Sequence, residues 1–167
     1  MKKRRSILKI FKALFILLTI QTSFAQTKTV NVDAFDKVIV SPHIQVTFQE
    51  GNSESLEIES STEPEEKINI EVNGKTLRIY LDGAKEVTKS EKVKENGYER
   101  NKSIYNGTVV VATVTYKNLE ELSLRGEERI VCESPLQGKR FHLKIYGESQ
   151  VYLNEVDFED LKTTIYG

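Results

Sequence analysis

Few residues in this 167-residue sequence have the chemistry of a catalytic or metal site. The chain contains two histidines, His43 and His142, and a single cysteine, Cys132. A zinc site needs several His, Cys or carboxylate ligands that converge, and neither a His-x-x-x-His nor a Cys-x-x-Cys spacing occurs. We therefore predict no metal and no cofactor, and we interpret both histidines as surface or strand-end residues.

The sequence also argues against nucleophilic catalysis. Cys132 and His142 could form a thiol–imidazole pair. In the repeat described below, however, Cys132 takes an inward position, where a small thiol stays protonated and unreactive. The Gly-x-Ser-x-Gly motif of serine hydrolases and the glycine-rich phosphate loops are both absent. We expect no catalytic residue and no enzyme activity.

Carboxylates are the remaining candidates, because pairs of Asp or Glu residues cleave glycosidic bonds. The acidic residues of the C-terminal part fall at turns and not on the outward face of strands: Glu127, Glu128, Glu148, Asp157, Glu159 and Asp160. This placement suits solvated turn charges better than an acid–base pair. A carbohydrate-active enzyme is kept as an alternative function.

Apolar side chains recur at every second position from residue 38 onward, which is typical of β-strands. Such runs occur at 38–40, 44–48, 56–59, 68–72, 77–81 and 108–116. We therefore expect strands to carry the residues discussed above. Asn73-Gly74 separates two of the runs and favours a tight primed turn, so residues 68–81 are predicted to form a hairpin. Residues 84–107 break the pattern with many charges and predict a solvated loop, insert or short helix outside the core.

The C-terminal part repeats a strand that ends in glycine. The segments 122–126, 143–147 and 163–167 end on glycines that lie 21 and then 20 residues apart. Alignment on these glycines stacks similar residues in an inward position: Leu122, Leu143 and Thr163; Leu124, Ile145 and Ile165; Ile130 and Val151; Cys132 and Leu153. Repeated stacking of this kind builds the core of a β-solenoid. We predict a right-handed parallel β-helix-like solenoid with rungs of about 20 residues, and a second meander sheet is the alternative.

The fold class is all-β, with an N-terminal strand and hairpin region that leads into the solenoid. We assign residues 1–25 to a signal peptide, 26–83 to the N-terminal β region, 84–107 to the charged loop or insert, and 108–167 to the rungs. No polar cap follows Gly167. We expect a C-terminally truncated chain, and the alternative is an uncapped rung through which the protein self-associates or adds strands to a partner.

A signal peptide is predicted from the N-terminal residues. Basic residues 2–5 precede an apolar run of eight at 13–20, and Ser23-Phe24-Ala25 supplies a cleavage site between Ala25 and Gln26. The run is far shorter than the roughly 20 apolar residues that span a bilayer, and no integral membrane segment is expected after cleavage. The mature chain has 18 Lys and Arg against 25 Asp and Glu, a net charge of −7. This charge disfavours nucleic acid and anionic lipid as partners.

Several of these segments resemble the auto-transporter adhesin head domain, also called the head GIN domain. The likeness rests on residues 35–41, 44–51, 74–79 and 114–122 with the glycine repeats, and it covers most of residues 30–167. It implies an exported envelope protein of Gram-negative bacteria of the Bacteroidetes type, with a β-helical body and no established enzymatic activity. The chain departs from the family at Ser41-Pro42-His43, and the family usually continues through further rungs.

An outward column of side chains is the predicted recognition surface. On the glycine alignment Arg125, Tyr146 and Tyr166 stack, flanked by Lys144 and Tyr152. Aromatic faces stack on sugar rings and Arg adds directed donors, although sheets favour tyrosine for stability alone. We predict a non-enzymatic binding module of the cell envelope, located in the periplasm, at the outer membrane or outside the cell. The expected partner is a surface glycan or an envelope or matrix protein.

Overall fold

The computed structural model describes residues 28–95 and 97–167, which form strands and one short 3-10 helix, η1 (Glu65–Lys67). The strands are β1 (Lys28–Asn31), β2 (Lys37–Val40), β3 (Ile44–Glu50), β4 (Ser55–Ser61), β5 (Ile68–Asn73), β6 (Thr76–Leu81), β7 (Ser90–Glu95), β8 (Tyr98–Ser103), β9 (Val110–Tyr116), β10 (Glu121–Gly126), β11 (Arg129–Cys132), β12 (Leu136–Gly147), β13 (Gln150–Leu153) and β14 (Val156–Tyr166). The all-β prediction is confirmed. The cleavage site predicted at Ala25 and Gln26 lies outside the described residues.

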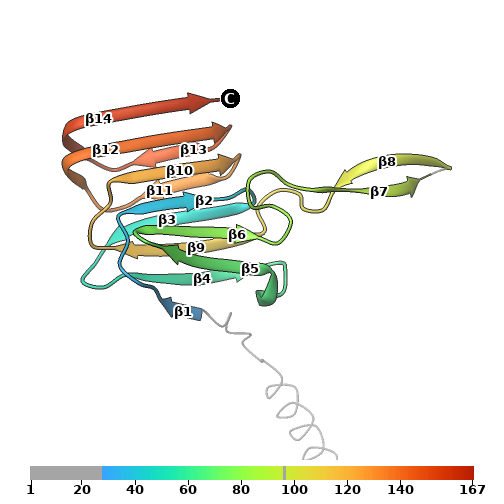
Figure 1. The fold of residues 1–167 in the computed structure, drawn as a ribbon, viewed down its shortest axis with the longest axis horizontal. Coiled ribbons are helices and arrows are strands. Elements are labelled where there is room, and N and C mark those ends of the chain that lie inside the picture. The colour runs from blue at the N-terminus through green and yellow to red at the C-terminus, as the bar shows by residue number, and fades with distance from the viewer. Residues whose placement is uncertain (1–27, 96) are drawn as a thin grey trace, which may run out of the picture.

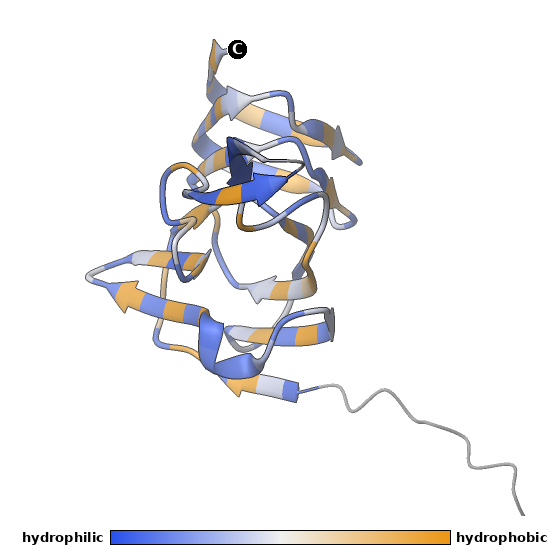
Figure 2. Cartoon of the chain, turned by 90° about the vertical axis from the view of Figure 1, so that its right-hand side faces the viewer, coloured by the Kyte–Doolittle hydropathy of each residue, from blue (hydrophilic) through white to orange (hydrophobic). Residues whose placement is uncertain are grey.

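The strands form three sheets (Figure 1). Sheet A has the order β1-β4-β9-β3-β11-β13, sheet B the order β14-β12-β10-β2-β6-β5, and sheet C pairs β7 with β8. Inward side chains alternate with outward ones, as in β3, where Ile44, Val46 and Phe48 are fully buried. Figure 2 shows the resulting alternation of apolar and polar residues along the strands. The buried residues of sheets A and B form one core.

Most of sheets A and B is a parallel, in-register stack. In sheet B, β12 pairs in parallel with both β10 and β14, and Leu122 lies beside Leu143, which lies beside Thr163. In sheet A, Ile130 pairs with Val151. The stacking predicted from the glycine spacing is therefore confirmed at these positions.

The N-terminal strands belong to the same stack. β2 lies between β6 and β10 in sheet B, and β3 lies between β9 and β11 in sheet A, with every pairing parallel. The chain thus enters the stack in its middle, leaves it through β4 and β5, and returns as β6 and β9. No local sequence pattern indicates this order.

Antiparallel strands complete the sheets at the end of the stack opposite β14. β4 pairs with both β1 and β9, and β5 pairs with β6 in the hairpin that Asn73-Gly74 predicts. Gly74 has φ +61° and the next residue of the two-residue turn, Lys75, has a negative φ. This is the pattern of a type II′ turn, whose first central position favours glycine.

The charged segment 84–107 contains a β-hairpin where a loop or short helix was expected. β7 and β8 pair antiparallel, and their side chains are largely exposed. The hairpin projects from the side of the stack (Figure 1). Backbone pairing forms this element, because the segment has too few apolar residues to bury a face of its own.

The repeated glycines allow successive turns of the chain to approach closely. Gly126 and Gly147 have φ +125° and +122°, which L side chains rarely adopt. A Cβ added at Gly147 would lie 2.5 Å from the carbonyl oxygen of Gly126. One added at Gly167 would lie 3.1 Å from the carbonyl oxygen of Gly147. The spacing of 21 and 20 residues therefore marks the places where backbone packs on backbone.

Cys132 and Tyr116 are titratable groups within the core. Burial raises the pKa of the Cys132 thiol from 9.0 to about 12. Burial, with Cys132 and Glu50 nearby, raises the pKa of Tyr116 from 10.0 to about 12. The prediction that Cys132 is buried on the inward face is confirmed, and the raised pKa agrees with a protonated thiol.

Replacement of Gly147 by alanine should destabilise the fold by at least about 2 kcal/mol, because it combines a strained φ with a backbone clash. Chemical unfolding measures the change. Gly74→Asn is the matched control, since Gly74 has a left-handed φ but nothing within 4 Å of an added Cβ. Its cost should be clearly smaller than that of Gly147→Ala, because this variant has the unfavourable positive φ but no clash with the backbone. Equal losses in the two variants would contradict the close-approach explanation.

Stability should decrease above pH 9. The folded-state pKa of Cys132 is raised, so its contribution is complete below the unfolded pKa and is lost as pH rises toward 12. The loss between pH 9 and 10 should be about 1 kcal/mol. Unfolding curves of Cys132→Ala should lack this decrease and retain the decrease above pH 10 that Tyr116 contributes. An unchanged pH profile in Cys132→Ala would show that another group is responsible.

Candidate functional site

The predicted column of Arg125, Tyr146 and Tyr166 exists on the outer face of sheet B. The register aligns Arg125 with Tyr146 and Tyr146 with Tyr166. The two tyrosine rings stack with centroids 5.3 Å apart and an interplanar angle of 12°, and the Arg125 guanidinium lies 5.2 Å from the Tyr146 centroid. Tyr146 and Tyr166 are 37% and 61% exposed, so both rings contact solvent. Arg125 and Tyr166 thus lie on opposite sides of the Tyr146 ring, and the column offers a ligand the exposed parts of these packed side chains.

Ion pairs hold the basic residues around the column in place. Arg125 and Arg78 both pair with Glu86, which comes from the segment that precedes β7. Lys144, the predicted flanking residue, donates to Glu121 at 2.8 Å. These cations already have partners, so they position the aromatic rings more than they offer free charge.

Tyr152 does not flank the column. It lies on β13 in sheet A, whereas the column lies on sheet B. Tyr152 is 50% exposed, and the Arg129 guanidinium lies 4.8 Å from its ring centroid. The prediction that Tyr152 flanks the column was wrong. The chain passes from sheet B to sheet A between Gly147 and Gln150, and the spacing of residues in the repeat does not indicate this change.

A groove of about 700 Å³ lies at the glycine-bearing ends of β10, β12 and β14. It is lined by Tyr146, by Glu127, Glu128 and Glu148, and by His43. Glu128 is only 9% exposed, whereas a solvated turn charge was expected. Its Oε2 accepts a hydrogen bond from the Glu127 amide at 3.0 Å, and its Oε1 lies 3.8 Å from Nδ1 of His43. The Glu128 carboxylate is therefore held in a buried position by the amide of its neighbour and by His43.

His43 connects the stack to the segment that carries the hairpin. Its Nδ1 lies 2.7 Å from the Gly107 carbonyl oxygen, which can only accept, so Nδ1 donates. Its Nε2 lies 2.7 Å from the Thr88 hydroxyl. The residue has φ +71°, an unusual value for a side chain of this size. His43, directly before β3, therefore has a structural role, since it links the stack to the residues on both sides of the hairpin.

His142 is an outward residue aligned with Lys162, as predicted. Desolvation, with Lys144 nearby, lowers the pKa of His142, which leaves the ring neutral at pH 7. Cys132 is buried on the inward side of sheet A, so the two residues do not form a catalytic pair. Residues 28–95 and 97–167 contain no group of three or more His, Cys, Asp or Glu that could hold a metal ion.

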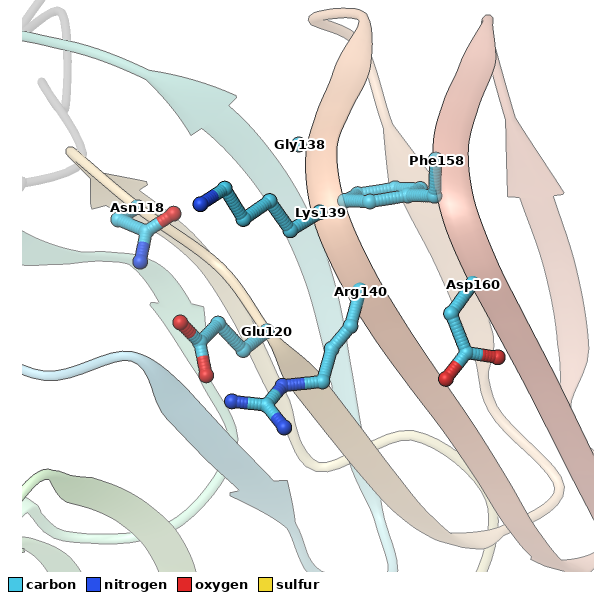
Figure 3. Close-up of a pocket in the computed structure, with 7 residues that line it drawn as sticks. All are labelled: Asn118, Glu120, Gly138, Lys139, Arg140, Phe158 and Asp160. Carbon is cyan, nitrogen blue, oxygen red and sulfur yellow. The ribbon is translucent and has the colours of Figure 1, made fainter.

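A second hollow on the outer face of sheet B was not predicted. Two adjoining depressions of about 470 and 370 Å³ share Glu120, Arg140 and Asp160. In Figure 3, Lys139 and Arg140 extend from β12 toward Asn118 and Glu120, and Phe158 reaches from β14 toward Gly138. We call these two depressions the basic groove, because their lining also includes Lys37 and Lys162. Its signal in the sequence is the alternation of Arg140, His142, Lys144 and Tyr146 along one strand face.

Within the part of the chain that the structure describes, no helix has the length and apolar character needed to cross a bilayer. No curated protein matches the chain.

Solved structures with this fold include proteins from Bacteroides fragilis and Parabacteroides distasonis. A structure titled "putative adhesin" from Bacteroides fragilis aligns with a TM-score of 0.67 and 17% identity, covering 87% of this chain and 60% of that one. A "putative adhesin" from Parabacteroides distasonis has a TM-score of 0.63 and 18% identity, covering 85% and 53%. A "putative lipid binding protein" from the same species has a TM-score of 0.54 and 16% identity, covering 86% and 63%. The chain thus spans less than two thirds of each, and the similarity concerns the fold.

The sequence itself matches a family model over most of its length. The model is described as "Putative auto-transporter adhesin, head GIN domain", and it matches residues 34–167. These residues include the parallel stack, the column and the basic groove. The chain therefore belongs to the auto-transporter adhesin head GIN domain family.

Proposed function

We propose that this protein is an exported, non-enzymatic module of the cell envelope that binds a surface glycan on the outer face of a right-handed β-solenoid. The parallel pairings of sheets A and B support the solenoid. The predicted signal peptide and the adhesin family support export, and an N-terminus at Gln26 in protein recovered from the cell envelope checks this part of the proposal.

The stacked rings of Tyr146 and Tyr166 are the observation that carries the binding function. Sugar rings present C–H faces that pack on aromatic rings, and tyrosine loses little conformational entropy when it binds. The Arg125 guanidinium extends this stack toward β10 and is fixed by Glu86. A fixed, solvent-accessible aromatic platform requires no rearrangement to receive a ligand, which favours affinity.

Replacement of Tyr146 by alanine should weaken glycan binding about two- to tenfold, because it removes the central ring against which Arg125 and Tyr166 pack. Affinity electrophoresis against a panel of soluble polysaccharides measures the change. Tyr152→Ala is the matched control, since Tyr152 is also an exposed tyrosine on a strand, 50% against 37% for Tyr146, but lies on sheet A. Binding that is lost equally in both variants, or absent for every polysaccharide, would contradict the proposal.

A carbohydrate-active enzyme is the second candidate, and one observation favours it. The groove at the glycine-bearing strand ends brings Glu127, Glu128 and Glu148 beside Tyr146, and Glu128 is buried. Carboxylates in such a groove could cleave a glycosidic bond. The expected result is no new reducing ends when the protein is incubated with any polysaccharide that it binds. Release of reducing ends that Glu128→Gln abolishes would replace the binding function by catalysis.

A further inference from the structure

We propose that the ligand of the outer face of sheet B is an acidic polysaccharide, whose anionic groups bind in the basic groove while its sugar rings stack on Tyr146 and Tyr166. This inference rests on the proposed function and specifies its ligand class. It follows from three features of the face: its charge, the pairing state of its cations, and the strand that links the groove to the column.

The outer face of sheet B has the opposite charge from the rest of the protein. The strand register places six cations on it: Lys37, Arg78, Arg125, Arg140, Lys144 and Lys162. It places three carboxylates there, Glu71, Glu121 and Asp160. The strand residues of this face thus carry +3, and +2 when Glu86, which pairs with Arg78 and Arg125, is counted, whereas residues 26–167 together carry −7. A polyanion is attracted to this face and repelled by the remaining surface.

The cations divide into two groups according to their partners. At the column end, Arg78 and Arg125 pair with Glu86, and Lys144 pairs with Glu121. In the basic groove, Arg140 and Lys162 make no ion pair with any carboxylate of the described residues, although Asp160 and Glu120 line the same hollow. Their charges are therefore free for a ligand. The Arg140 guanidinium can bind a carboxylate or sulfate in a bidentate manner.

Phe158 adds an apolar wall to the groove. Its ring stacks on the buried Phe141 with centroids 5.1 Å apart and an interplanar angle of 14°. It also covers Gly138, where an added Cβ would lie 3.2 Å from the ring. The ring is thus held by packing at the edge of a hollow that bears free cations. A surface that combines apolar and cationic groups suits a sugar acid better than an inorganic anion.

β12 connects the groove to the column. Arg140, His142, Lys144 and Tyr146 alternate along its outer side, so Arg140 and Tyr146 are about 20 Å apart along the strand. A polymer of a few sugar units can reach both ends. An acidic chain along β12 would place anions beside Arg140 and Lys162 at one end and a ring against Tyr146 at the other. Small anions could occupy only the groove.

The test measures the affinity of wild-type protein and of two double variants for polysaccharides by affinity electrophoresis. The measurements are repeated at increasing salt concentration. The groove variant is Arg140→Ala with Lys162→Ala. The control is Lys94→Ala with Lys102→Ala, which removes the same charge from the exposed hairpin. The probes are alginate, a polyuronate; dextran sulfate; and uncharged dextran. The first two distinguish carboxylate from sulfate, and dextran has the same backbone as its sulfated form.

Wild-type protein should bind alginate, dextran sulfate or both more tightly than dextran, and salt should weaken that binding. The groove variant should lose between about twofold and thirtyfold in affinity, the range for two exposed ion pairs, while the control changes little. Equal binding of dextran, or equal effects of both double variants, would overturn the inference. So would binding of duplex DNA or anionic phosphatidylglycerol vesicles as tight as that of the acidic polysaccharide.

These outcomes separate the inference from the proposed function. Binding of dextran that depends on Tyr146 but not on Arg140 and Lys162 would preserve the glycan-binding function and reject the acidic ligand. Absence of binding to every polysaccharide would reject both. Thermal unfolding of the variants verifies their folding, and since Arg140 and Lys162 are exposed, both double variants should unfold near the wild-type temperature.

Discussion

The parallel register of the stacked strands is the constraint on which the rest of the structure depends. A shift of one residue in any strand would turn every inward side chain outward. Leu122 beside Leu143 and Ile130 beside Val151 fix the core, and the same register brings Arg125, Tyr146 and Tyr166 together on the outside. The outer column is therefore a geometric consequence of core packing. The register also sets Gly147 against the backbone of Gly126, where an added Cβ would clash, so glycine stands opposite glycine.

This dependence explains which features could be predicted from the sequence. The glycine spacing gave the correct alignment of β10, β12 and β14, because each glycine occupies the same tight position in successive turns. Asn73-Gly74 gave the hairpin of β5 and β6, because turn chemistry is local. The inward position of Cys132 could be predicted from its place in the repeat. Burial at this position then raises the pKa of its thiol. In each case, the determining interaction lies within one repeat or one turn.

Other features depend on contacts that no local pattern contains. The position of β2 and β3 in the middle of the stack requires strands from distant parts of the chain to pair. Tyr152 lies on a different sheet from Tyr146, because the chain turns a corner between them. Glu128 is buried by its own backbone neighbour and His43, which lies far away in the sequence. The hairpin of β7 and β8 is stabilised by backbone pairing and has no apolar alternation to reveal it.

A filled core also limits where this protein can act. Inward columns of apolar residues fill the core of the described part of the chain, which places the proposed binding on an outer face or at the strand ends. The two outer faces differ, because β12 of sheet B links the stacked tyrosines to Arg140 and Lys162, which pair with no carboxylate of the described residues, whereas Tyr152 of sheet A packs only with Arg129 and bonds to Gln150. Charge on a flat sheet binds weakly at each site, and a repeating polymer compensates through several contacts at once. A stack with regular strand spacing is thus well suited to a repeating ligand, and the excess negative charge on the remaining surface restricts a polyanion to this face.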